Sequence, residues 1–515
     1  MSEFAIALAL VPMLCVAAIL LVADRIGSGT PLGVIRAAAV GAALVSLVGV
    51  GAVAYSRPEF DVSWIPSLGV RLDLAADGIS TPLMLLSAVV GVVAVALRHE
   101  PAVAPGSVQQ TAPLTRRNAD PGVATYYGCL LLVLCGALIT FMARDAVVFF
   151  VGFETVLLPM WVLIARHGDA SQAARRDGAA LRFLLITATG STLMVVGILV
   201  MATATGSTDL DVWAEQAGAS MSGSQQLAVA VLLLLGLGLK VPIWPLHTWL
   251  PWVHATAPTA GSVLLAAVLL KMGTYGIVRL VIPGVPDGFS RVAPVLAGCA
   301  VVGIIWAGLA ALVESDLKRL IAWASIAHLG FVVLALAAGT QTGMQAALFG
   351  NIAHGAISAL LFVVVGALKY RWGSADLTTA RAAVREVSPR LGFGLVVGMA
   401  ASMGLPGLAG FWGEFGAIYA AWDPAEDRHA GWFSLFAVLA AVGAALAAAY
   451  SVRVLREVWA GDRTRPVIAD ATLLERSVIG VLVLAVVALG VYPLAVLDLT
   501  EPAVTALWEF AGAGR

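Results

Sequence analysis

Apolar stretches of about 20 residues recur from one end of the chain to the other. As a helix, each stretch is long enough to cross the roughly 30 Å hydrocarbon core of a bilayer. The chain has 515 residues, of which 60% are hydrophobic and only 12% are charged. A soluble protein of this length could not cover its surface with so few charges. The sequence therefore predicts an all-α polytopic membrane protein.

The same pattern sets the expected number of spans. We predict fourteen transmembrane helices, with approximate cores at residues 4–23, 33–54, 78–97, 123–142, 146–165, 180–203, 226–246, 259–281, 292–313, 318–337, 344–368, 391–421, 432–455 and 477–498. The longest polar connections are 99–122 and 204–225. The first is rich in Pro, Ala, Gln and Thr and is expected to be a flexible loop. Neither is long enough to hold a nucleotide-binding or flavin-binding domain.

Basic residues are distributed unequally between the two sides of the membrane. Of the 30 lysines and arginines, Lys240 and Lys271 lie within spans, and the connections that follow odd-numbered spans carry 21 of the rest against 7 on the other side. Lysine and arginine are enriched in cytoplasmic loops. We therefore expect a multi-pass protein of the bacterial inner membrane with both termini on the outer, non-cytoplasmic face.

Other features of the composition argue against several classes of function. The net charge of −1 gives no sign of nucleic-acid binding. No glycine pattern typical of nucleotide binding stands between a strand and a helix. The four cysteines lie in apolar segments without metal-binding spacing, and we interpret them as small core residues: Cys15, Cys129, Cys135 and Cys299. We expect no metal and no cofactor on this chain.

Six ionisable residues nevertheless fall inside six different predicted spans. They are Glu154, Lys240, Lys271, His328, His354 and Glu414. A charge at the centre of a membrane helix costs roughly 2.5–3.5 kcal/mol on insertion scales. Taken singly, each residue has an ordinary structural explanation: a lysine that extends to the headgroups, a hydrogen-bonded histidine in the core, or a glutamate that neutralises one lysine. Taken together, they predict a polar line through the membrane interior.

The residue types in this line suit proton transfer. A carboxylate beside an ammonium keeps both groups charged, whereas separation allows the lysine to release its proton. A buried lysine changes its proton affinity readily, and histidine can relay protons near neutral pH. We therefore predict that these six residues form a proton path.

Two of the spans contain breaks at corresponding places. Prolines interrupt "LGLKVPIWPLHTW" (237–249) and "GLPGLAGFWG" (404–413), and proline removes a backbone donor from a helix. The spans are five apart, so a five-span unit repeated in tandem has opposite membrane orientations. We predict two inverted five-helix repeats, spans 4–8 and 9–13, with helices 7 and 12 broken. The alternative, that membrane helices simply tolerate proline, stays open.

This reading divides the chain into four parts. Residues 1–122 hold three helices and a loop, 123–281 the first repeat, 292–457 the second repeat, and 458–515 a loop and the last helix.

One long segment closely resembles the signature of a known family. The block "LGLKVPIWPLHTWLPWVHATAPTAGSVLLAAVLLKMGTYGIVRL" is similar to that of the antiporter-like subunits of respiratory complex I. The resemblance covers about residues 125–460 and points to the subunit M branch. Four further segments resemble the same family: "ESDLKRLIAWASIAHLGFV" (314–332), "FETVLLPMW" (153–161), "NIAHGAISALLFVVVGAL" (351–368) and "GLPGLAGFWGEF" (404–415).

The resemblance implies a role for each acidic and basic member of the line. It implies that Glu154 and Lys240 form the family's ion pair and that Lys271 is the central lysine. Glu414 would be the terminal residue that faces one side of the membrane.

The two histidines, His328 and His354, match histidines of the family's connecting axis. The chain also departs from the family pattern. Trp252 and Ala257 stand where acidic residues are expected, and Trp412 stands where a smaller aliphatic residue is common. Neither departure affects the predicted proton line.

The resemblance implies a proton-translocating membrane subunit that binds no redox cofactor itself. NADH, FMN, iron–sulfur clusters and quinone would belong to partner subunits. The implied partners are the other membrane subunits of complex I, including sister antiporter-like subunits on either side, and the lipid bilayer, but no nucleic acid. Two other kinds of function stay open: a subunit of a multi-subunit Na⁺/H⁺ antiporter or membrane-bound hydrogenase, and a purely structural membrane scaffold.

Overall fold

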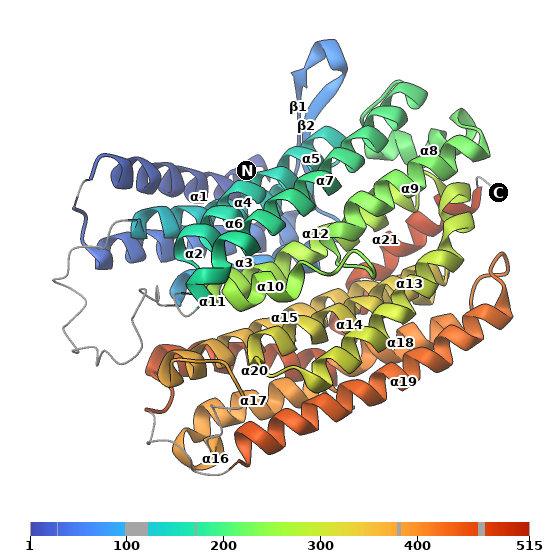
Figure 1. Cartoon of the computed structure of the whole chain (residues 1–515). Coiled ribbons are helices and arrows are strands. Elements are labelled where there is room, and N and C mark those ends of the chain that lie inside the picture. The colour runs from blue at the N-terminus through green and yellow to red at the C-terminus, as the bar shows by residue number, and fades with distance from the viewer. Residues whose placement is uncertain are drawn as a thin grey trace.

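The computed structural model describes residues 2–27, 29–97, 122–169, 172–377, 383–461 and 469–513, which form a bundle of long, roughly parallel helices (Figure 1). The predicted loop 99–122 lies outside the described residues, except for Gly122. The N-terminal part contains α1 (Ser2–Arg25), α2 (Leu32–Ser56), β1 (Glu59–Ile65), the short 3₁₀ turn η1 (Pro66–Leu68), β2 (Val70–Ala75) and α3 (Ser80–Ala96).

The next part of the chain contains α4 (Val123–Met142), α5 (Ala146–Thr155), α6 (Leu157–His167), α7 (Ala173–Thr205), α8 (Leu210–Ser220), α9 (Gly223–Lys240), α10 (Leu250–Thr256), α11 (Thr259–Leu264), η4 (Leu265–Leu269), α12 (Leu270–Gly276) and η5 (Ile277–Val281). The last part contains α13 (Pro286–Val313), α14 (Leu317–Ala337), α15 (Gln341–Trp372), α16 (Val384–Val387), α17 (Pro389–Ser402), α18 (Gly410–Trp422), α19 (Ala430–Val454), η6 (Leu455–Trp459), α20 (Leu473–Val491) and α21 (Leu494–Ala513). The elements η4, η5 and η6 are π-helical turns.

The helices confirm a multi-pass, predominantly α-helical membrane protein. In the described part of the chain, twelve helices are long and apolar enough to cross a membrane. Two predicted spans are not among them, for different reasons. The span at 78–97 corresponds to α3, which has 17 residues, and the span at 391–421 corresponds to α17 and α18, which are separated by a break. The count of fourteen therefore stays a prediction.

A two-stranded hairpin adds β structure to the predicted all-α class. Strands β1 and β2 pair antiparallel, with Glu59 opposite Ala75, and the hairpin extends away from the helices (Figure 1). Gly69 adopts a positive φ of 68° in the connecting turn, a conformation that favours glycine. An open sheet edge is tolerated here because water, unlike lipid, can bond its unpaired backbone groups.

Contacts between the connections agree with the predicted alternation of the spans. On one face, Lys369 forms an ion pair with Asp169. On the other face, Arg279 and Arg144 both pair with Asp77. Burial acts to raise the pKa of the Asp77 carboxyl, but the Arg279 and Arg144 guanidiniums hold it well below its usual range. We call the face that contains Lys369 the basic face. That it is the cytoplasmic face stays a prediction.

Both predicted helix breaks are confirmed. Helix α9 ends at Lys240 and the next helix begins at Leu250. Helix α17 ends at Ser402 and α18 begins at Gly410. The inverted symmetry of the two repeats stays a prediction.

Two further interruptions and the helices α8 and α21 were not predicted. The span at 146–165 is interrupted at Val156, between α5 and α6. The predicted last span, 477–498, is wrong as one helix, because the chain leaves α20 before Pro493 and begins α21 at Leu494. Helix α21 packs on the start of α15, where Thr500 donates a 2.5 Å hydrogen bond to Gln345. The connection expected at 204–225 contains α8.

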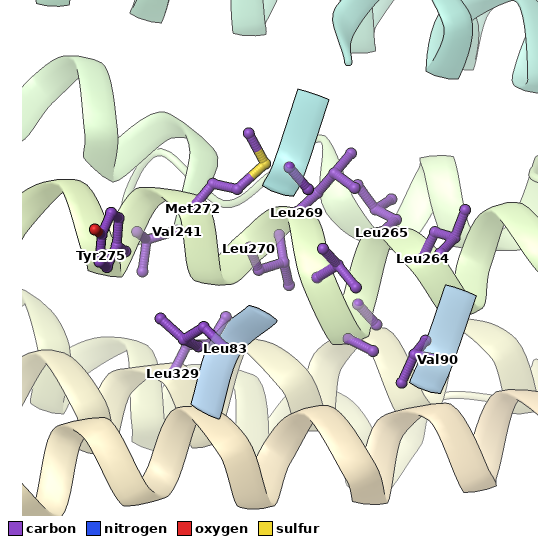
Figure 2. Close-up of a cluster of buried hydrophobic side chains, with 14 of the residues drawn as sticks. Leu83, Val90, Val241, Leu264, Leu265, Leu269, Leu270, Met272, Tyr275 and Leu329 are labelled. Carbon is purple, nitrogen blue, oxygen red and sulfur yellow. The ribbon is translucent and has the colours of Figure 1, made fainter. Parts of the chain in front are cut away.

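Two spans lie at the centre of the bundle. The segments Thr259–Val281 and Gln341–Trp372 are each 94% buried over their most apolar windows, against 28% for α20. Buried apolar side chains of neighbouring helices lie around the first segment, including Leu83, Val90 and Leu329 (Figure 2). Lys271 and His354, which lie within these two helices, are therefore enclosed by the protein itself.

The cysteines are only partly in this core. Cys129 and Cys135 are buried, as interpreted from the sequence. Cys299 is half-buried, and Cys15 is exposed on the outward side of α1, so the core interpretation is wrong for Cys15. Small size and moderate polarity allow cysteine on a lipid-facing helix surface as well as in a core.

Candidate functional site

The two central spans bring the first pair of predicted site residues together. Lys271 on α12 is fully buried. Its Nζ lies 2.5 Å from Nδ1 of His354 on α15 and donates a 2.6 Å hydrogen bond to the carbonyl of Ala266. Ala266 belongs to the π turn η4, in which the backbone amide of Leu270 bonds the carbonyl of Leu265, five residues earlier. Such wide turns are frequent at functional sites, and this one offers the ammonium group an acceptor inside the membrane.

A second hydrogen bond fixes the relation between these spans. Thr274, one turn after Lys271, donates a 3.0 Å bond to the side-chain oxygen of Asn351, one turn before His354. Because both ends of this contact lie on helices, the pairing of Lys271 with His354 does not depend on a loop.

The second pair consists of His328 on α14 and Glu414 on α18. Nδ1 of His328 lies 2.8 Å from Oε1 of Glu414. Nε2 of the same ring lies 2.9 Å from the Ser402 hydroxyl and 3.4 Å from the Tyr450 hydroxyl. Gly404 stands beside the carboxylate, since a Cβ there would lie 2.7 Å from Oε2 of Glu414. Either nitrogen of an imidazole can carry the proton, so His328 can both accept and donate at this position.

A small cavity joins the two pairs. The rings of His328 and His354 lie 5.8 Å apart, and both line a cavity of about 20 Å³ together with Glu414. A cavity needs roughly 10–15 Å³, together with polar partners, to hold one water molecule. Nε2 of His354 is buried and has no hydrogen-bond partner among the described residues. The cavity therefore has the size and the polar lining to hold one water between the two histidines.

Glu154 and Lys240 lie apart from this connected group. The Glu154 carboxylate accepts a hydrogen bond from the Ser191 hydroxyl on α7. Nζ of Lys240 lies 4.1 Å from the centre of the Phe153 ring, a cation–π arrangement. Within the described residues, the two groups form no ion pair shorter than 4.0 Å. The ion pair implied by the resemblance is therefore open in this structure.

Glycine allows the lysine helix to approach the central span. A Cβ on Gly273 would lie 2.6 Å from a methyl group of Val241, 3.0 Å from the Leu237 carbonyl and 3.3 Å from Cβ of Lys240. The backbone at Lys240 thus packs directly on α12 at Gly273, which follows Lys271 by two residues. The side chains nearby are apolar and buried, including Val241 and Met272 (Figure 2). The contact region between the helices that carry Lys240 and Lys271 is therefore apolar.

Two of the buried basic residues that the sequence interpretation missed are His254 and Lys318. His254 on α10 is fully buried and stacks on Phe362 with 4.5 Å between ring centres, and neither ring nitrogen has a hydrogen-bond partner in the described part of the chain. Lys318 was counted as a loop charge, which is wrong, because it is only 1% exposed and its Nζ donates a 2.7 Å bond to the Ala257 carbonyl. Lys318 stands directly at the start of an apolar span, and that position was the available signal.

The described residues contain no candidate metal-binding site. No group of three or more His, Cys, Asp or Glu side chains lies close enough together to hold a metal ion there. The groups gathered at the centre of the bundle can exchange protons through hydrogen bonds, and that is the chemistry their arrangement supports.

Comparison with known proteins places this geometry in context. A family model described as "NADH:quinone oxidoreductase/Mrp antiporter, TM" matches residues 143–442. NAD(P)H-quinone oxidoreductase chain 4 1 of Synechococcus sp. (strain JA-3-3Ab) is 34% identical over 442 residues, which are 84% of this chain and 78% of that protein. NADH-quinone oxidoreductase subunit M of Rhodobacter capsulatus is 32% identical over 469 residues, which are 87% of this chain and 83% of that protein.

A solved structure shares the fold. A chain of respiratory complex I from Thermus thermophilus with bound NADH superposes with a TM-score of 0.83 at 24% identity, covering 99% of this chain and 100% of that one. The similarity extends over the N-terminal and C-terminal helices as well as the segment that the family model matches.

Proposed function

Because the chain belongs to the family of membrane subunits shared by NADH:quinone oxidoreductases and Mrp antiporters, we propose that it translocates protons as a membrane subunit of an NADH:quinone oxidoreductase. It carries no redox cofactor in this proposal; NADH, FMN, iron–sulfur clusters and quinone belong to partner subunits. Its neighbours are other membrane subunits, with sister antiporter-like subunits on either side.

One observation supports the proposal: four titratable side chains from four helices lie next to one another in the interior of the helix bundle. Lys271 contacts His354 at 2.5 Å, His354 and His328 share the small cavity, and His328 contacts Glu414 at 2.8 Å. A structural role for one lysine would need one acceptor, which Ala266 already supplies. Two histidines and a carboxylate in series are unnecessary for that purpose and sufficient for a relay.

Proton transfer along this series needs only exchanges between neighbours. A protonated Lys271 passes a proton to Nδ1 of His354, while the proton on Nε2 leaves to a water in the cavity. That water passes a proton to His328, and Nδ1 of His328 passes one to Glu414. Each step breaks one bond to hydrogen and forms one, so charge and protons balance. Glu414 then releases its proton toward one side of the membrane.

The supply of protons to Lys271 passes through Lys240 in this proposal. Lys240 lacks a close carboxylate in the open arrangement, and its separation from Glu154 favours release of its proton. The ammonium can swing on its flexible stem, because it stands at the last residue of α9, directly before the non-helical residues 241–249. The apolar contact between α9 and α12 blocks proton transfer from Lys240 to Lys271 until Lys240 moves or water enters.

The test is proton pumping by membranes that contain the intact enzyme complex. Replacing His354 with Gln removes the relay between Lys271 and the cavity. We expect proton pumping and coupled NADH oxidation to fall by about a hundredfold, the typical lower bound for a lost general acid–base group. His429→Gln, an exposed histidine outside the spans, is the matched control and should pump normally. Normal pumping by H354Q would refute the relay.

Substitution of Glu154 or Lys240 by Ala tests the supply side. Both variants should show sharply lower pumping and coupled NADH oxidation, and wild-type rates in both would refute the assignment of these two residues.

A second candidate function is a subunit of a multi-subunit Na⁺/H⁺ antiporter or, less directly, of a membrane-bound hydrogenase. Of these two alternatives, the family description supports the antiporter, since it names the Mrp antiporter beside NADH:quinone oxidoreductase and does not name a hydrogenase. Deleting this chain distinguishes the oxidoreductase from the antiporter. If the chain is an oxidoreductase subunit, its deletion should abolish NADH oxidation that is sensitive to piericidin or rotenone. If it is an antiporter subunit, its deletion should abolish Na⁺-dependent proton exchange and leave that oxidation intact. A structural scaffold predicts instead that all six predicted site residues can be neutralised without loss of function.

A further inference from the structure

Three arginines surround the one aromatic residue that replaces an expected acidic residue. Trp252 lies on α10, and the guanidinium carbons of Arg319, Arg182 and Arg175 lie 5.1, 5.2 and 5.9 Å from the centre of its indole ring. The arginines come from α7 and α14, so three helices meet at this ring. Tryptophan is the strongest aromatic partner for a guanidinium. We call these four residues the Trp252 cluster.

The Trp252 cluster carries more positive charge than its surroundings balance. Arg319 has the Glu314 carboxylate 3.1 Å away. Neither Arg175 nor Arg182 has a carboxylate within 4.0 Å in the part of the chain that the structure describes. Like charges gathered on one ring repel each other. An anion that contacts the guanidiniums would relieve this repulsion.

The contacts with Trp252 leave the arginines able to bind such an anion. A cation–π contact depends on the positive charge over the ring and does not require the N–H donors of the guanidinium as hydrogen bonds. Those donors form a planar fork that matches the oxygens of a phosphate group. Arg175 and Arg182 are both exposed on α7, so an anion from outside the protein can reach them.

The surroundings of the cluster are those of a lipid headgroup site. Arg175 and Arg319 stand in the first turns of α7 and α14, at the helix ends on the basic face. Leu181 and Leu185, adjacent to Arg182 and one turn deeper, are 53% and 57% exposed. A basic, tryptophan-containing helix end above an apolar helix surface is typical of the membrane interface.

We propose that the Trp252 cluster binds the phosphate group of an anionic phospholipid from the leaflet on the basic face. The phosphate oxygens accept hydrogen bonds from Arg175 and Arg182, while Trp252 holds both guanidiniums in position. The acyl chains lie along Leu181 and Leu185. A free phosphate ion would gain nothing from these leucines, and an acidic protein segment would leave polar backbone against them, so a lipid fits both halves of the surface.

Binding of phosphatidylglycerol to the full-length chain in neutral detergent, measured by native mass spectrometry, tests the proposal without reference to pumping. Each basic residue near an anionic membrane surface contributes about a factor of five in affinity. The double variant R175Q/R182Q should therefore bind dioleoylphosphatidylglycerol about thirtyfold more weakly than the wild type. W252F keeps an aromatic ring under the guanidiniums and should bind within about threefold of the wild type.

The control is R385Q/R390Q, which removes two exposed arginines from another connection of the same basic face. It should leave phosphatidylglycerol binding unchanged, and an equal loss there would overturn the proposal in favour of diffuse surface charge. Equal binding of dioleoylphosphatidylcholine by the wild type would also overturn it.

A further variant distinguishes the lipid from a free anion. L181S/L185S should weaken phosphatidylglycerol binding and leave binding of inorganic phosphate unchanged. If inorganic phosphate competes as well as the lipid does, or if L181S/L185S binds the lipid normally, the site is one for a soluble anion and the lipid proposal fails. Unchanged lipid binding by R175Q/R182Q, with normal elution and helicity of the variant, would overturn it directly.

Discussion

The two halves of the buried titratable line differ in how their members contact each other. On one side, Glu154 bonds Ser191 and Lys240 rests on the Phe153 ring, without an ion pair between them. On the other side, His328 and Glu414 are in direct contact at 2.8 Å beside a cavity of water size. The members of the second half contact each other directly, whereas those of the first half do not, and in the proposed relay a movement of Lys240 changes this open arrangement.

The position of each helix break explains this difference. Lys240 is the last residue of α9 and directly precedes its break, so the non-helical chain gives it freedom to move. Glu414 follows its break and stands in the second turn of α18, where backbone hydrogen bonds fix it. In the proposed relay, Lys240 before its break is the member that moves, and Glu414 after its break is a member that stays in place.

Replacing Lys271 should have the largest effect, because this residue joins the two halves. Lys271→Met keeps an unbranched side chain, one atom shorter, but removes the ionisable group, and we expect proton pumping to fall at least about a hundredfold. Quenching of a ΔpH-sensitive dye in membrane vesicles measures this. Met272→Leu, a neighbouring change of similar volume, should be harmless. More than a tenth of normal pumping in K271M would mean that the halves communicate by another route.

Comparing the two glutamates tests the difference itself. Glu414→Gln removes the carboxylate that takes up a proton from His328 in the proposed relay, whereas Glu154→Gln leaves an amide that can still accept the hydrogen bond from Ser191. We expect E414Q to pump about tenfold more slowly than E154Q, a difference equivalent to about 1.4 kcal/mol in the barrier. Initial rates of proton uptake at equal complex content give the comparison. Equal rates in the two variants would show that the halves work as equivalent stations.

Adding one methyl group to Gly273 should separate Lys240 from the central span. The new Cβ would lie 2.6 Å from Val241 and 3.0 Å from the Leu237 carbonyl, and such overpacking costs about 1–3 kcal/mol. Thermal unfolding of the purified chain would show this loss. Gly178→Ala on α7 is the control, since nothing lies within 4 Å of a Cβ there. If G273A is as stable as G178A, the contact between α9 and α12 is looser than the structure has it.

Removing the Ser191 hydroxyl should shift the first half toward its paired arrangement. Ser191→Ala takes away the hydrogen bond to Glu154, which is worth about 0.5–1.5 kcal/mol net, or more for a charged acceptor. The freed carboxylate should turn toward Lys240. A structure of S191A would then show the two groups within ion-pair distance, and an unchanged separation would exclude Ser191 as the group that holds the pair open.

The smallest expected effect is on the stability of the hairpin and concerns the Asp73 carboxyl, which lies outside both halves. It serves as a control for the pH dependence of pumping. Burial raises the pKa of Asp73 to about 6, and Asp61, its partner across the hairpin, acts in the same direction. The folded hairpin therefore favours the protonated form, and it loses stability as pH rises from about 4 to 6.

Asp73→Asn should remove this pH dependence and protect the hairpin at pH 8 by at most about 1 kcal/mol, after solvent screening. Hydrogen exchange of residues 59–75 at pH 5 and pH 8 measures it. The pH profile of pumping should not change; if it does, that profile reports the hairpin and says nothing about the two halves.

Several residues of the candidate site could be predicted from the sequence, because membrane segments are recognisable as apolar runs. Ionisable residues inside apolar runs can be recognised without a structure, so Lys271 and Glu414 were found. Sequence reasoning missed His254 and Lys318, because a residue at the edge of an apolar run looks like a loop residue until the fold buries it. The hairpin was missed for a related reason: its short strands carry a much weaker pattern than the helices around them.

By itself, the sequence determined the membrane class, the breaks after Lys240 and before Glu414, and the identity of the central titratable groups. These follow from local hydrophobicity and from proline, which act within a few residues. Only the tertiary structure decided which of these groups touch. Lys271 and His354 are 83 positions apart in the chain, and their contact depends on how two enclosed helices pack, which no local pattern specifies.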